Sequence, residues 1–176
     1  MNKDGHVLNA ALLAVGLGVV LSVDPTAGPV VDDSPTETLL AAGRTAVELS
    51  LPVVLGALFP DVDTAFGKHR KTLHNLPVLA LFVAFPLVFG NLQYVWVGVA
   101  THYLLDVVGS KRGIALFYPF SPTEYDLPTG VATSSKWATT VTVVVTAVEL
   151  VALAVVHYFV FALDTTFVEM MAMVGV

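Results

Sequence analysis

The sequence has no cysteine and very little charge, and both absences narrow the class of protein. Without cysteine, disulfides, cysteine nucleophiles and thiolate metal sites are excluded. Only 12% of the 176 residues are charged, against about 25% in soluble domains. Hydrophobic residues make up 56% of the chain, and the mean hydropathy is +0.79. So few charges do not cover a soluble globule, and lipid must therefore cover much of the surface.

Basic residues are also scarce. Eight Lys and Arg stand against fourteen Asp and Glu, which gives a net charge of −6. A chain with this balance lacks the electrostatic footprint of a nucleic-acid-binding protein. We therefore expect membrane lipids as its partners and no nucleic acid. Since thiolates are excluded, any metal must be held by histidine, carboxylate or water.

Five apolar stretches predict an all-α, polytopic membrane bundle of about five embedded helices, in one domain covering residues 1–176. They comprise residues 7–23, 38–59, 76–89, 92–108 and 139–163. Spanning a bilayer takes about 20 residues, with a range of about 17 to 25. The number of crossings falls to four if the second stretch is re-entrant. Within that stretch, Arg44 and Glu48 share one helical face, which we expect to face the bundle rather than lipid.

The distribution of Lys and Arg predicts the orientation. With a cytoplasmic N-terminus and five crossings, seven of the eight basic residues lie inside, which is a strong positive-inside signal. The loops at 60–75 and 109–138 are then cytoplasmic. The loop at 24–37, which contains no Lys or Arg, lies outside. We therefore expect the chain in the plasma or inner membrane, with its C-terminus outside.

Histidine and carboxylate residues recur at the predicted cytoplasmic ends of these helices. His102 and Asp106 are four residues apart, so both side chains project from one helical face. This spacing allows two ligands to reach one metal ion, as in helical zinc motifs. A His–Asp hydrogen bond or an interhelical polar contact is the alternative interpretation, and the pair alone does not decide between them.

Two further motifs lie in the loop at 60–75. FPDVD contains Asp61 and Asp63, one of which could instead cap a short helix over residues 65–71. HRKTLHN contains His69 and His74, whose five-residue separation requires a bend, or two metals, for shared coordination. Taken alone, this second motif is also consistent with a basic loop that contacts anionic head groups.

The case for a site rests on the coincidence of these motifs on one side of the membrane. The candidate metal ligands are His6, Asp61, Asp63, His69, His74, His102 and Asp106. Nitrogen and oxygen ligands without thiolates suit zinc, with manganese as an alternative divalent metal. Asp63 could also act as a general base, and Arg70 could clamp a phosphate or carboxylate. His157 lies deep in the last stretch and stands apart.

The order of these motifs resembles the YdjM-like family, described as LexA-binding, inner-membrane-associated, metal-dependent hydrolases. The matching segments are His6, GALFPDVD at 56–63, His69-Arg70 with His74, His102 with Asp106, and GIALFYPF at 113–120. The resemblance runs from residue 6 to about residue 122. The HxxxD pair is also similar to that of helical zinc-dependent phospholipases C and P1 nucleases, and this likeness implies phosphoester hydrolysis.

The residues and the resemblance together favour a membrane-bound, metal-dependent hydrolase that acts at the cytoplasmic face on a phosphoester or lipid-linked substrate. One alternative is a non-catalytic adaptor or regulator with a structural metal or polar cluster. A second is a small transporter with a relay of ionisable residues, made of Arg44, Glu48, His102, Asp106, Glu149 and His157. Clustering on one side favours the hydrolase, because a relay needs ionisable groups distributed through the depth of the bilayer.

Overall fold

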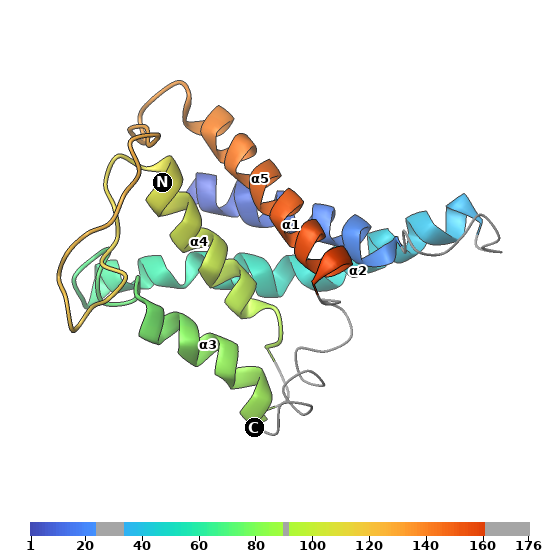
Figure 1. Ribbon diagram of the computed structural model, residues 1–176, viewed down its shortest axis with the longest axis horizontal. Helices are drawn as coiled ribbons and strands as arrows, with labels where there is room; N and C mark the ends of the chain where they lie inside the picture. Colours follow the sequence, from blue (N-terminus) through green and yellow to red (C-terminus); the bar gives the residue numbers. More distant parts are fainter. Residues whose placement is uncertain (24–33, 90–91, 161–176) are drawn as a thin grey trace.

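The computed structural model describes residues 1–23, 34–89 and 92–160, and these residues are helical with connecting loops (Figure 1). They form five α-helices and one short 3-10 helix: α1 (Lys3–Ser22), α2 (Pro35–Leu58), η1 (Pro60–Ala65), α3 (Leu76–Phe89), α4 (Val95–Gly109) and α5 (Ala138–Phe159). Among the described residues there are two isolated β-bridges and no strand. The predicted all-α bundle is confirmed, with each helix lying on one of the five apolar stretches.

Three segments of the described residues are long and apolar enough to cross a bilayer. These are α1, α2 together with η1 (Pro35–Ala65), and α5. The helices α3 and α4 are apolar but have only 14 and 15 residues, fewer than the roughly 20 that a straight crossing requires. Two of the five embedded helices are therefore shorter than a full span.

The boundaries of α2 follow from its sequence. At its start, the hydroxyl of Ser34 accepts a hydrogen bond from the Glu37 backbone, and the Glu37 carboxylate accepts one from the Ser34 backbone, which makes a capping box. At its end, Pro60 has no backbone N–H with which to continue the helix, and the chain tightens into η1. This change of direction places the FPDVD motif beside the end of α2.

Two glycines allow α2 and α4 to cross closely. A Cβ atom on Gly56 would lie 2.0 Å from the carbonyl oxygen of Val95, and a Cβ atom on Gly98 would lie 2.0 Å from that of Val53. No larger residue fits between these backbones. Since His102 lies one turn after Gly98, the crossing brings its ring against the last turn of α2.

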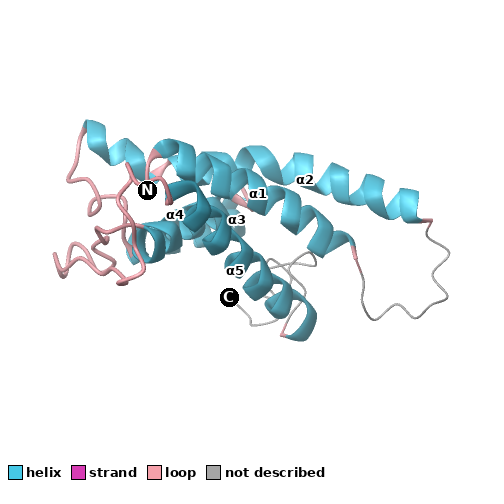
Figure 2. Ribbon diagram, turned by 90° about the horizontal axis from the view of Figure 1, so that it is seen from above, coloured by secondary structure: helices cyan, strands magenta, loops and turns pink. Residues whose placement is uncertain are grey.

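The helix ends that carry the motifs gather at one end of the bundle. Figures 1 and 2 show the start of α1, the end of α2, the end of α4 and the start of α5 there, with the loops at 66–75 and 110–137 beside them. Which side of the membrane this end faces stays a prediction. Most of the predicted outer loop and the C-terminus lie outside the described residues.

The expectation that Arg44 and Glu48 face the bundle is wrong. Both side chains are exposed on α2, whose buried residues are Ala42, Leu49, Val53, Gly56 and Ala57. The close packing of α2 against α1 and α4 selects the small and apolar side of the helix, which leaves the charged pair on the outer surface.

Candidate metal centre

Side chains from α1, η1, the loop after η1 and α4 meet at the end of the bundle where the loops at 66–75 and 110–137 lie, which we call the loop end. They form three overlapping groups whose ligand atoms lie within 4.8 Å of one another: His6 with Asp61 and His102, Asp61 with His69 and His74, and His74 with His102 and Asp106. Six of the seven residues predicted as metal ligands are thus brought together. Asp63 belongs to none of these groups, and His157 lies apart on α5.

The middle of this cluster is formed by two histidines. The Nε2 atoms of His74 and His102 are 3.1 Å apart. Oδ1 of Asp61 lies 3.7 and 3.8 Å from these two nitrogens, and Oδ2 of Asp106 lies 4.0 and 3.8 Å from them. Two nitrogens bound to one tetrahedral zinc are about 3.3 Å apart, given Zn–N bonds of about 2.0–2.1 Å. The donor atoms and their spacing therefore fit a divalent cation.

Hydrogen bonds at the far side of each ring fix the orientation of these histidines. Nδ1 of His102 lies 2.6 Å from the carbonyl oxygen of Ala57, which belongs to the last turn of α2 and has a carbonyl free to accept. Nδ1 of His74 lies 3.0 Å from Oδ2 of Asp63. A proton on each Nδ1 leaves each Nε2 lone pair directed into the cluster, as is usual for histidines that bind metal.

Asp63 lies behind the histidines rather than among the facing donor atoms. Its side chain is fully buried. Oδ1 accepts from Nδ1 of His69 at 3.0 Å, and Oδ2 accepts from Nδ1 of His74 and, at 3.3 Å, from the backbone of Leu73. Both carboxylate oxygens are therefore occupied in holding the two rings. The short helix over residues 65–71 that one aspartate of FPDVD could have capped does not form, and the residues after η1 are turns.

A left-handed residue supplies the bend that HRKTLHN requires. Arg70 has a φ of 67°, a conformation that non-glycine residues adopt rarely and that is concentrated at functional sites. The turn allows His69 and His74, five residues apart, to point at the same carboxylate of Asp63. Their ring centroids are 5.3 Å apart.

The side chain of Arg70 is buried beside the cluster. Its guanidinium donates to the carbonyl oxygens of Arg112 and Gly113 and, at 3.3 Å, to the hydroxyl of Ser110. It also lies 3.9 Å from Oδ2 of Asp106. Arg70 therefore attaches the loop after α4 to the cluster and places a fixed positive charge next to one of its carboxylates.

His6 completes the cluster from α1. Its ring is stacked on that of His102, with centroids 3.6 Å apart, and its Nε2 lies 3.5 Å from Oδ1 of Asp106, which the amino group of Met1 also contacts. Although the side chain is only 1% exposed, neither ring nitrogen has a hydrogen-bond partner among the described residues. Buried polar atoms without partners are costly, and a bound cation would satisfy one of them.

Sequence reasoning did not single out several groups that hold this cluster. Tyr103 donates from its hydroxyl to the carbonyl of Leu73 at 2.5 Å, and its place next to His102 was an available signal. Asn75 starts α3 by accepting from the backbone of Val78. The carbonyl of Ala57 could not have been found, because a backbone acceptor has no side-chain signature.

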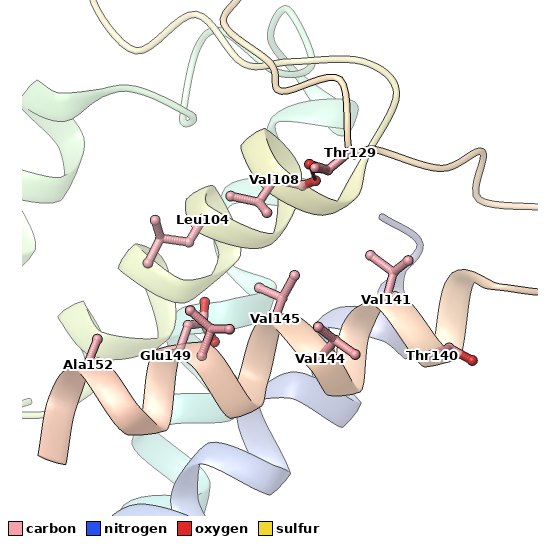
Figure 3. Close-up of a pocket in the computed structure, with 10 residues that line it drawn as sticks. Leu104, Val108, Thr129, Thr140, Val141, Val144, Val145, Glu149 and Ala152 are labelled. Carbon is pink, nitrogen blue, oxygen red and sulfur yellow. Dashed lines mark hydrogen bonds between the residues drawn. The ribbon is translucent and has the colours of Figure 1, made fainter.

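A second buried polar group lies between α1 and α5. The amide of Asn9 donates to Oε2 of Glu149 at 2.7 Å and to Oγ1 of Thr146 at 2.9 Å. Oε1 of Glu149 has no partner among the described residues. Figure 3 shows Glu149 at the edge of an apolar cavity of about 440 Å³ between α4 and α5, whose other lining residues include Leu104, Val108, Thr129, Thr140, Val144 and Val145.

The helices and the buried His/Asp cluster define an integral membrane protein with a candidate divalent-metal centre. The YdjM inner membrane protein family matches residues 1–175, so the chain belongs to that family and the resemblance seen in its motifs is confirmed. No curated protein and no solved structure matches the chain.

Proposed function

We propose that this protein is a membrane-bound, metal-dependent hydrolase whose His/Asp centre faces the cytoplasm. The observation that carries the proposal is the pair of Nε2 atoms of His74 and His102, 3.1 Å apart, with a carboxylate oxygen of Asp61 and of Asp106 facing both. A closed structural zinc site uses four protein ligands. Six candidate ligands exceed that number, which favours a centre with a coordination position left for water or substrate.

The metal would be held by His6, Asp61, His69, His74, His102 and Asp106. Zinc suits this histidine-rich set, and manganese is the alternative. A bound divalent cation supplies Lewis acidity and lowers the pKa of its water toward neutrality. Asp63 positions His69 and His74 through its two oxygens. Arg70 keeps a guanidinium beside Asp106, where an anionic phosphoryl group would be attracted.

A phosphoester of a membrane lipid, or a lipid-linked phosphoester, is the proposed substrate. The centre lies at the end of a bundle of membrane helices, which is the level of a lipid head group. The cavity between α4 and α5 runs from Thr129 and Thr140 at this end to Ala152, farther along α5 (Figure 3). Its volume of about 440 Å³ falls within the range of about 300–1,000 Å³ typical of ligand pockets, and its apolar lining suits a lipid chain.

The proposal is tested with protein purified without chelators. We expect at least one tightly held divalent ion per chain by elemental mass spectrometry, and zinc- or manganese-dependent cleavage of phosphomonoesters, phosphodiesters or lipid phosphoesters. His102→Ala and Asp106→Ala should abolish both the metal and the activity. His157→Ala is the matched control, because this histidine lies outside the cluster.

Two outcomes would contradict the proposal in different ways. Metal-loaded protein that is inert on every ester class would favour the non-catalytic adaptor with a structural metal. Protein without stoichiometric metal would remove the metal centre itself, and with it the hydrolase.

A further inference from the structure

Two charged side chains on the outer surface of α2 lie away from the proposed hydrolase centre. Arg44 and Glu48 lie on the outer surface of a helix that is long and apolar enough to cross a membrane. Within the part of the chain that the structure describes, neither side chain forms an ion pair. Charged groups in membrane helices are costly and normally face a partner or a water-filled space.

The packing of α1 against α2 gives the depth of these charges. A Cβ atom on Gly18 would lie 2.6 Å from the carbonyl oxygen of Ala42 and 2.8 Å from the side chain of Ala46, so Gly18 and Arg44 are level. Gly18 is four residues before the end of α1, which places Arg44 about 6 Å from that end. Glu48 is one turn deeper, at about 12 Å, close to the middle of a hydrocarbon core about 30 Å thick.

Arg44, about 6 Å from the end of α1, can extend its long side chain toward the head groups. Glutamate has a short side chain and is too deep to do so. Lipid contact therefore does not accommodate the charge of Glu48. A positively charged partner would neutralise it.

The residues around the pair have the pattern of a helix–helix interface. Leu40, Arg44, Val47 and Leu51 follow one another at spacings of four, three and four residues, as in the seam of paired helices, and Val47 is 75% exposed. At Gly43 an added Cβ would meet nothing within 4 Å, so this side of the helix is open. Small residues at such positions allow two membrane helices to approach closely.

We propose that α2 is the interface of a homodimer, in which Arg44 of each copy pairs with Glu48 of the other. Two copies with the same orientation in the membrane are related by a two-fold axis along the membrane normal, so every contact occurs twice. One positive and one negative charge, one turn apart, are self-complementary in this arrangement. Both glutamates are then neutralised within the bilayer without any other protein.

Charge reversal in trans tests this pairing. Arg44→Glu leaves two negative groups on α2, and Glu48→Arg leaves two positive groups. Each variant alone should lose self-association by at least tenfold, measured with two differently tagged copies in lipid nanodiscs. Coexpression of the two variants should restore association, because each supplies the charge that the other lacks. The double variant Arg44→Glu with Glu48→Arg should also associate, which shows that the reversed charges permit folding.

A matched control uses an exposed ion pair away from α2. Arg112→Glu and Glu124→Arg reverse the same charges in the loop after α4, where these residues pair at 3.3 Å, and should leave self-association unchanged. Cysteine crosslinking adds geometry, since the chain has no native cysteine. Val47→Cys should crosslink to itself, whereas Val144→Cys, exposed on α5, should not.

Three results would overturn the proposal. The first is a monomeric wild type in nanodiscs. The second is single variants that associate as well as the wild type. The third is coexpressed variants that associate no better than either alone, which would assign Arg44 to Glu48 of the same helix or to a different protein.

Discussion

Two of the regions that place ionisable side chains in apolar helices treat those side chains in opposite ways. At the loop end, His6, His74, His102 and Asp106 are buried together, and Asp63 is buried behind His74. On the outer surface of α2, two opposite charges are exposed, with no ion pair to the described residues. In the first region, other side chains of the same chain offset most of the cost of desolvation, with the ring nitrogens of His6 as the exception. In the second region, no described side chain offsets the cost.

A charge in a membrane helix therefore does not by itself indicate which way the helix faces. Burial at the loop end depends on a set of partners that come from separate segments of the chain. Where no such set exists, as around Arg44, packing of the small and apolar face decides the rotation of the helix, and the charges remain outside.

The largest effect expected is an all-or-none labelling result that checks which side of the membrane the cluster occupies. The positive-inside signal predicts that a single cysteine introduced between residues 26 and 36 labels from outside in intact cells. A cysteine between residues 122 and 133 should label only after the membrane is opened. The reverse pattern would place the His/Asp cluster outside the cytoplasm.

Gly98→Leu should destabilise the buried His/Asp cluster at the loop end. The new side chain would overlap the carbonyl oxygen of Val53, and we expect a loss of about 3 kcal/mol or more of stability together with the bound metal. Thermal unfolding in detergent and metal content are the measurements. Val151→Leu is the control, since this residue is exposed on α5, away from the crossing of α2 and α4. An unchanged melting temperature for Gly98→Leu would mean that α2 and α4 do not cross as closely as described.

Asp63→Asn should have a smaller effect on the same region. An amide cannot accept hydrogen bonds on both sides, so His69 or His74 loses its orienting partner. We expect metal affinity to fall by about 10–100-fold while the helices remain folded, as for other residues that orient metal ligands. Competition with a chelator measures the affinity, and circular dichroism measures the helices. An unchanged affinity would assign the orientation of the rings to other contacts.

The smallest expected effect lies on the loop surface, at Glu124. Its slight burial acts to raise the pKa, but hydrogen bonds from Arg112 and Lys71 lower the pKa below its ordinary value. A carboxyl group with a lowered folded-state pKa stabilises the protein above its unfolded pKa and loses that contribution as the pH falls through the folded pKa. Since the pair is exposed, Glu124→Gln should cost less than about 1 kcal/mol near pH 7 and nothing at low pH. A pH-independent difference in melting temperature would exclude the ionic contribution.

Much of the fold followed from the sequence because helix formation in apolar segments is local. The five apolar stretches became five helices, since a membrane helix satisfies its backbone hydrogen bonds within its own segment. The i,i+4 spacing of His102 and Asp106 required them to share a face whatever the surroundings. The ordered motifs were sufficient to identify the family.

Other features depended on contacts between residues far apart in the chain, and the sequence pattern did not predict them. Asp63 lies behind the histidines because the left-handed turn at Arg70 brings His69 and His74 back to it. Nδ1 of His102 meets the carbonyl of Ala57 because Gly56 and Gly98 let two helices cross closely. Arg44 and Glu48 face outward because α1 and α4 pack on the opposite side of α2. The pattern of a helix shows which residues share a face, and the neighbouring helices determine where that face points.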